Sequence, residues 1–220
     1  MTEQKMTKEK RSRGRPTVRT EQETRALLLT AAADVFLSEG YAGTSIEAVA
    51  RRAGMSTRTI YKTVSNKASL FRLVADNALE TGIAHLDTSS DATSVEGALF
   101  ALSRAYADLV LSNAGVLNAR AVFAEQSQFP EFRENYLSSI KTVADAFDRR
   151  FVVIFSDCTT LQERDLYEAA SLLRSMINGA QREAVLDPAY DGTAAAISAW
   201  SDTCTNFALR AMRNTQAANG

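Results

Sequence analysis

The stretch AVARRAGMSTRTIYKTVSNK, residues 48–67, predicts two short helices separated by a break at Gly54. The second helix is too short to be stable alone, because isolated helices in water need about 12–15 residues. Ile60 and Val64 supply an apolar inner side on which it can dock, while its other side carries hydroxyls, cations and one aromatic ring. Two short helices joined by a glycine-containing turn form the helix-turn-helix of DNA-binding proteins.

The outward residues of the second helix have the chemistry that a DNA groove requires. A recognition helix enters a major groove about 12 Å wide, where hydroxyls and cations bond to base edges and threonine methyls contact thymine methyls. Thr57, Arg58, Thr59 and Lys62 offer these groups. Tyr61 either gives its hydroxyl to a phosphate or packs its ring on the preceding helices, since an aromatic body with a polar tip suits both roles.

Capping signals and apolar spacing predict helices along the whole chain and no convincing strand. Thr20-Glu21-Gln22-Glu23 and Thr44-Ser45-Ile46-Glu47 both have the capping-box spacing. The expected helices cover residues 21–40, 44–54, 57–62 and 65–86, and then 94–113, 116–126, 130–154, 162–186 and 192–213. The predicted fold class is therefore all-α, with an N-terminal three-helix helix-turn-helix domain and a larger C-terminal helical domain.

Charge divides the chain in the same place. Residues 1–72 hold 14 Lys and Arg against 7 Asp and Glu, a balance of +7, whereas residues 73–220 hold 11 against 19, a balance of −8. A basic part beside an acidic part suggests that the basic part meets a polyanion. Residues 1–19 form an expected disordered basic arm, in which Arg13 and Arg15 can lie in a narrow minor groove.

The residues that most enzymes and metal sites need are scarce. His85 is the single histidine, so neither a triad nor a histidine metal site can be completed, and no phosphate-binding glycine motif is present. The two cysteines, Cys158 and Cys204, are too few for a disulfide framework. We therefore expect no enzyme activity, cofactor or metal, and no membrane partner, because no apolar run approaches about 20 residues. The charged first residues lack a secretory signal, which predicts a cytoplasmic protein.

Residues 21–72 resemble the N-terminal domain of the tetracycline-repressor (TetR) family of bacterial transcription regulators. The matching string is LLLTAAADVFLSEGYAGTSIEAVARRAGMSTRTIYKTVSNKASLF, residues 27–71. One departure is Val64, where the family more often has phenylalanine. The resemblance implies an all-helical homodimer, a palindromic operator, a small-molecule effector and repression as the usual mode. It divides the chain into a DNA-binding domain, residues 20–72, and an effector-binding and dimerisation domain, residues 73–220.

The resemblance also implies which residues contact DNA, and the residue types agree with the groove chemistry. Phosphate contacts are expected at the start of the second helix from Thr44 and Ser45, and from Lys67, whose charge opposes the dipole of its own helix. Free amides at helix N-termini would assist them. The recognition element would consist of Ser56, Thr57, Arg58, Thr59, Tyr61 and Lys62.

The C-terminal half predicts a dimer interface and, less directly, a ligand cavity. ARAVFAEQSQFPEFRENYL, residues 119–137, resembles a subtype found in regulators related to AefR. The last two helices alternate small and large residues, as closely packed helices do. One face would join the subunit core, and the other could pair with the same helices of a two-fold mate in a four-helix bundle. Alternatively, both faces belong to the core of one subunit. The interface candidates are Leu166, Ala170, Leu173, Ile177, Trp200, Cys204, Phe207 and Ala211. Candidates for lining a cavity that takes an apolar or aromatic effector are Phe100, Tyr106, Phe123, Tyr136, Phe147 and Met176, all of which could equally be plain core.

Another function stays open besides DNA-binding regulation. A helix-turn-helix scaffold can serve as a protein-interaction module, because a fold does not fix a function. The basic arm and the cationic outer face favour the DNA-binding alternative. Neither the operator nor the choice between repression and activation follows from the residues.

Overall fold

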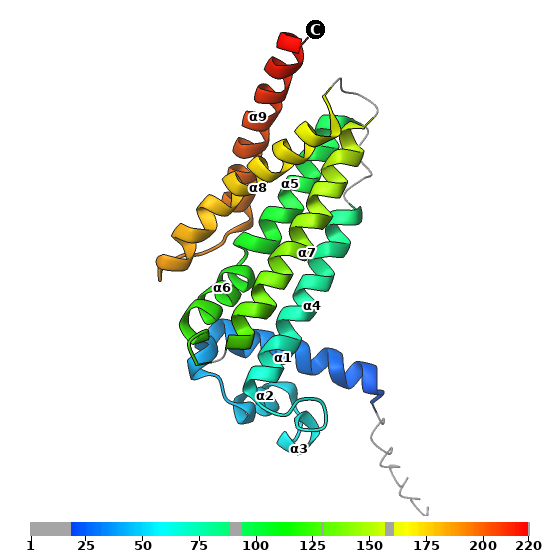
Figure 1. Ribbon diagram of the computed structural model, residues 1–220. Coiled ribbons are helices and arrows are strands. Elements are labelled where there is room, and N and C mark those ends of the chain that lie inside the picture. The colour runs from blue at the N-terminus through cyan, green and yellow to red at the C-terminus, as the bar shows by residue number, and fades with distance from the viewer. Residues whose placement is uncertain (1–18, 89–93, 129, 157–160, 220) are drawn as a thin grey trace, which may run out of the picture.

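The computed structural model describes residues 19–88, 94–128, 130–156 and 161–219, and within these ranges the secondary structure is helical without a strand. The all-α prediction is confirmed. Figure 1 shows α1, α2 and α3 gathered at one end of the molecule and the long helices α4, α5 and α7 running side by side away from them. Helices α8 and α9 cross on one flank of this bundle.

Helix α1 spans Glu21–Gly43 and begins as the sequence predicts. The Thr20 side chain accepts a hydrogen bond from the Glu23 amide, and the Glu23 carboxylate accepts one from the Thr20 amide. Gly40 takes a positive φ of 70°, which suits a residue without Cβ, and interrupts the helix before a last turn. The predicted end at Gly40 is therefore a kink, three residues before the helix ends.

The helix-turn-helix consists of α2, Ile46–Ala53, and α3, Thr57–Ile60. Gly54 closes α2 in the left-handed region at φ 62°, and its amide donates to the Ala50 and Arg51 carbonyls. The predicted Thr44 capping box is wrong, because Ser45 is the N-cap of α2 and accepts the Ala48 amide. Helix α3 is also shorter than predicted and passes into a turn after Ile60.

The remaining helices follow the predicted order with small shifts at their ends. Helix α4, Lys67–Thr88, is capped by Asn66, whose side-chain oxygen accepts the Ser69 amide. Ser112 caps the sixth helix and starts it three residues earlier than predicted. The C-terminal helices are α5 (Val95–Leu111), α6 (Asn113–Glu125), α7 (Pro130–Phe155), α8 (Glu163–Leu186) and α9 (Ala194–Asn219).

Two apolar cores hold the chain together. The larger core joins α4, α5, α7, α8 and α9 around the fully buried Phe147 and Phe151. The smaller core joins α1 to α4 and also takes in Val122 of α6 and Phe132 of α7. The helix-turn-helix end is therefore packed directly against the C-terminal half. No helix of the described segments is long and apolar enough to cross a membrane.

Candidate nucleic-acid interface and ligand cavity

Buried apolar side chains hold the α2-turn-α3 unit against the rest of the protein. Ile60 is fully buried and Val64 nearly so, as the sequence predicts. The Arg52 guanidinium also ties α2 to α1, because its Nε and Nη2 donate to one carboxylate oxygen of Asp34 at 3.2 and 2.7 Å. Burying a valine or isoleucine contributes about 1.5–3 kcal/mol. This anchoring lets a helix of four residues keep its position.

The opposite side of α3 faces solvent and is positively charged. Arg58 and Lys62 are exposed and make no ion pair with any residue in the described ranges, and 52% of the Tyr61 surface is accessible. Tyr61 is therefore available as a contact group as well as an anchor. The three side chains form a cationic and aromatic face that is open to a polyanion.

The other recognition residues also hold α3 in shape. The Ser56 hydroxyl accepts the Thr59 amide at 3.1 Å and lies 2.8 Å from the Thr59 hydroxyl, so this pair caps the helix. Thr57 is half-buried at the first helical position. A hydroxyl oxygen has a second lone pair, which leaves capacity for an outside partner.

Two predicted phosphate contacts are altered by the structure. The Thr44 side chain is 3% exposed and its hydroxyl donates to the Gly40 carbonyl at 2.7 Å, because it closes α1 after the kink. The predicted phosphate contact by this hydroxyl is therefore wrong. Ser45 remains exposed at the N-terminus of α2, where free amides attract anions.

Lys67 has a different partner from the one predicted. Its ammonium donates to the Tyr41 carbonyl at 2.9 Å and the Ala42 carbonyl at 3.2 Å, and it lies 4.6 Å from the centre of the Tyr41 ring. The last turn of α1 has no cation of its own, so Lys67 of α4 supplies the charge that its carbonyls favour. The conflict with the α4 dipole is therefore offset inside the protein by the carbonyls at the end of α1, and the phosphate contact of Lys67 stays a prediction. Arg13 and Arg15 lie outside the described residues.

A cavity of about 1200 Å³ lies between the helix-turn-helix end and the C-terminal bundle. Its walls come from α1, α4, α5, α6, α7 and α8. Tyr106, Phe123 and Tyr136 line it, as predicted. Phe147 is instead fully buried in the larger core, and Phe100 and Met176 pack against that core, so the predicted lining role of these three is wrong.

A buried polar network forms one wall of the cavity. The Tyr106 hydroxyl donates to the Asn178 side-chain oxygen at 2.9 Å, and behind it the Arg174 guanidinium makes a two-pronged ion pair with Asp148 at 2.7 and 2.8 Å. Burial raises the pKa of the Tyr106 phenol. Burial likewise raises the pKa of the Tyr136 phenol, and the nearby Tyr106 raises it further. Both phenols are therefore neutral hydrogen-bonding groups at pH 7.

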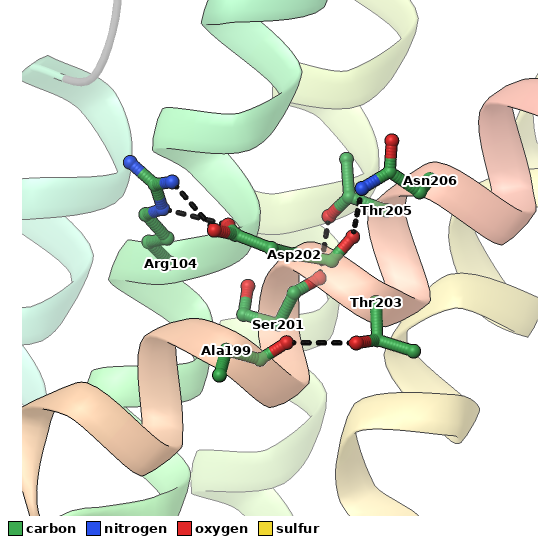
Figure 2. Close-up of polar contacts among 7 residues, drawn as sticks. All are labelled: Arg104, Ala199, Ser201, Asp202, Thr203, Thr205 and Asn206. Carbon is green, nitrogen blue, oxygen red and sulfur yellow. Dashed lines mark hydrogen bonds and ion pairs between the residues drawn. The ribbon is translucent and has the colours of Figure 1, made fainter.

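The positive charge of Arg104, which lines the cavity, is neutralised by a carboxylate of α9. Figure 2 shows the Arg104 guanidinium of α5 directed at the Asp202 carboxylate of α9, and both of its hydrogen bonds are 2.7 Å long. Two neighbouring hydroxyls of α9 bond back to their own helix, Thr203 to the Ala199 carbonyl and Thr205 to the Ser201 carbonyl. The Asp108 carboxyl, which also lines the cavity, has its pKa raised by burial, and His85 of α4 opposes that rise.

Helices α8 and α9 each divide their apolar residues between two faces. Five interface candidates are buried within the subunit, so their predicted role between subunits is wrong: Leu166, Ala170, Leu173, Ile177 and Cys204. Trp200 is 41% and Phe207 63% exposed, and Ala211 is exposed. Leu172, which the sequence does not single out, is 60% exposed on α8. Exposed apolar side chains thus remain on both helices, Leu172 on α8 and Trp200 and Phe207 on α9.

Most of the residues that line the cavity cannot be predicted from the sequence. Leu37, Val74, Leu109, Asn178 and Arg182 line the cavity, but none stands out by type or spacing. Each lies at an ordinary position of an amphipathic helix, and only the packing of six helices brings them together. No local pattern encodes that arrangement.

Comparisons with known proteins agree with this geometry. Residues 28–74 match the family described as bacterial regulatory proteins, tetR family. No curated protein matches the sequence. Among solved structures, a protein from Mesorhizobium loti described as a TetR-family transcriptional regulator superposes with a TM-score of 0.71 at 24% identity, over 88% of this chain and 98% of that one.

Two further solved structures have the same fold at lower identity. FadR from Bacillus halodurans, a fatty acid degradation regulator, gives a TM-score of 0.67 at 17% identity over 87% of this chain and 97% of its own. A TetR-family transcriptional regulator from Streptomyces coelicolor gives 0.64 at 20% identity over 87% and 96%. The chain therefore carries a TetR-family N-terminal domain within the all-helical fold of TetR-family regulators.

Proposed function

We propose that this protein is a bacterial transcription regulator that binds a palindromic operator as a homodimer and is released from it by a small-molecule effector. The exposed cationic face of α3, held by Ile60 and Val64, is the observation that carries the proposal. Arg58 of α3, with Tyr61 and Lys62 of the turn that follows, offers base and phosphate contacts on an element thin enough for the major groove. Such a regulator works in the cytoplasm, where the chromosome is.

The homodimer is supported by the exposed apolar side chains of α8 and α9, Leu172, Trp200 and Phe207. Apolar side chains gathered on adjacent helices are typical of protein–protein contacts. To read a palindromic operator, a two-fold axis through these side chains has to place two α3 helices on one side of DNA, about 34–36 Å apart for half-sites one turn apart. The AefR-like subtype of the C-terminal half remains a prediction.

The effector is supported by the cavity, whose wall includes Phe36 of α1 and Phe71 of α4. These two residues also belong to the core of the DNA-binding end, and their rings lie 5.1 Å apart. A molecule in the cavity would contact that core directly. It acts as a switch if it binds the DNA-competent and released conformations unequally.

Salt-dependent binding tests the proposal. Operator duplexes are first selected from a randomised pool, and fluorescence anisotropy then gives the affinity for a selected and a scrambled duplex across salt concentrations. The logarithm of the affinity should fall linearly with that of the salt concentration, with a slope of about −0.9 per phosphate neutralised. A flat salt dependence, or no duplex enriched by selection, would support a protein-interaction module instead.

Variants assign the roles of individual residues. Arg58→Ala should weaken the selected duplex more than the scrambled one if Arg58 contacts a base, whereas equal losses indicate a phosphate contact. Arg149→Gln removes an exposed arginine of α7, away from α3, and should change neither affinity. Deleting residues 1–15, which include Arg13 and Arg15, should flatten the salt slope.

A further inference from the structure

We propose that the effector of this cavity is an elongated apolar molecule that ends in a carboxylate, with the carboxylate on α8 and the apolar chain against α1 and α4. The inference rests on the proposed function, because it names the chemical class of the effector. It follows from the hydrogen-bonding groups that the cavity wall leaves unpaired and from where they lie.

The wall at α8 presents donors without partners. The Asn178 side-chain oxygen accepts from Tyr106, which leaves the two N–H groups of its amide unpaired. The Tyr136 hydroxyl makes no hydrogen bond with any described residue. Arg182 makes no ion pair within the described segments, although it lines the cavity. Each of these groups can donate to an acceptor from outside the protein.

The three donors line the same cavity. Asn178 and Arg182 are four residues apart on α8, so their side chains lie on the same helix face. Tyr106 bonds to Asn178, and Tyr106 and Tyr136 line this same cavity from α5 and α7. Arg182 is exposed as well as lining the cavity, so the charged head group would lie where solvent can still reach it.

The other charged groups of the wall do not compete for this position. Arg104 is already paired with Asp202, as Figure 2 shows. The carboxyl of Asp108 lies on α5 and makes no ion pair with Arg182. Arginine has donors and no acceptor, and an ionised carboxylate has acceptors and no donor. A cluster of donors with one uncompensated guanidinium therefore selects a carboxylate and disfavours an ammonium group.

The opposite part of the cavity is apolar. Phe36 and Leu37 of α1, Phe71 and Val74 of α4, and Leu117 of α6 line it. A long apolar chain could fill this region and touch the DNA-binding end while its head stays at α8. Its affinity should rise up to about fourfold for each added methylene until the apolar region is filled.

Ligands that share one tail test the head group. Isothermal titration calorimetry of the full-length protein compares decanoate, decanol and decylammonium, all as monomers in solution. Decanoate should bind at least about tenfold more tightly than decanol, because a hydrogen bond to a charged group contributes on that scale. Decylammonium should bind more weakly still. Decyl phosphate distinguishes the two anionic heads, and tighter binding of the phosphate would overturn the carboxylate assignment.

Two variants locate the head group. Arg182→Gln should weaken decanoate about tenfold and leave decanol unchanged, because only the charged contact is removed. Arg149→Gln is the matched control and should leave both affinities unchanged. Equal binding of decanoate and decylammonium, unchanged decanoate binding by Arg182→Gln, or no binding of any probe below about 1 mM would each overturn the proposal.

Operator binding measured without ligand tests the proposed function independently of the effector class. A protein that binds its selected duplex but not decanoate refutes only the effector class. A protein that binds decanoate but selects no duplex refutes the regulatory function and leaves the head-group assignment standing.

Discussion

Replacing Lys67 by methionine should destabilise the protein without changing its electrostatic contacts with DNA. The ammonium of Lys67 donates to the Tyr41 and Ala42 carbonyls at the end of α1 and lies over the Tyr41 ring. Methionine keeps most of the aliphatic stem and removes the charge and both hydrogen bonds. The carbonyls then lose their cation, while the packing of α4 on α1 changes little.

The expected loss of stability is about 2 kcal/mol. At this half-buried position each hydrogen bond contributes about 0.5–1 kcal/mol, below the 1.5–3 kcal/mol of fully buried bonds to charged groups. The contact with the Tyr41 ring adds about 0.5 kcal/mol. With a urea m-value of about 2.5 kcal/mol/M, the unfolding midpoint should fall by about 0.8 M.

Lys62→Met is the matched control, because Lys62 is an exposed lysine of the same domain without an ion pair in the described ranges. Its free energy of unfolding should stay within about 0.5 kcal/mol of wild type. In the anisotropy assay, Lys62→Met should reduce the salt slope by about 1 and Lys67→Met should not. Unfolding is followed by circular dichroism at one protomer concentration, since dimerisation adds to apparent stability.

The opposite pattern would refute this assignment of the two lysines. If Lys67→Met unfolds like wild type and loses one unit of salt slope, its ammonium contacts phosphate and not the end of α1. If both variants lose salt slope, Lys67 serves DNA as well as the helix end.

Three further changes test other parts of the structure. Arg120→Met should lower the free energy of unfolding by about 2 kcal/mol, because the guanidinium donates to three carbonyls at the end of α8. An unchanged melting temperature would contradict this expectation. Phe207→Asp should convert the proposed dimer into monomers in sedimentation velocity, whereas Val153→Asp, on a similarly exposed site of α7, should not. Loss of the dimer in both variants would count against the proposed surface. Gly82→Ala should lower the free energy of unfolding by about 1–3 kcal/mol and weaken decanoate binding. The reason is that the new Cβ would lie 2.5 Å from a methyl carbon of Leu109, which lines the cavity. Stability and affinity equal to those of the wild type would show that Leu109 moves freely.

Features that depend on neighbours in sequence could be predicted from the sequence. The capping box at Thr20 and the break at Gly54 need only residues within one turn, and both are present. Thr44 and Ser45 show the limit of this reasoning. Both are hydroxyl residues before an apolar helix, and what decides between them is the kink at Gly40, whose carbonyl takes the Thr44 hydroxyl. A local motif does not contain that competition.

The partner of Lys67 cannot be predicted from the sequence, for a different reason. A cation in the first turn of a helix signals that something offsets the dipole, and the sequence does show this conflict. Phosphate and the end of another helix are electrostatically alike, because both present partly negative oxygens. Only the placement of α1 beside α4 distinguishes them, and it puts the Tyr41 carbonyl 2.9 Å from the ammonium.

Periodicity also fails to assign the two faces of α8 and α9. Both faces carry apolar residues at helical spacing, so Leu173 and Leu172 are equivalent in the sequence. In the structure Leu173 is fully buried and Leu172 is 60% exposed, because α5 and α7 pack on one side only. The larger apolar residues on the uncovered side include Phe207, and exposing them is costly unless another surface covers them.

The position of the cavity limits how ligand and DNA can influence each other. Phe36 and Phe71 line the cavity and at the same time pack with Tyr41, whose carbonyl holds Lys67. A molecule filling the apolar part of the cavity must therefore contact the core that fixes α1 relative to α4, and through it the base of α2 and α3. Tight binding alone would shift nothing, since a ligand moves an equilibrium only by its difference in affinity for the two states. A hundredfold change in operator affinity needs about 2.7 kcal/mol of such a difference, which is comparable with burying three or four methylenes in one state and not in the other.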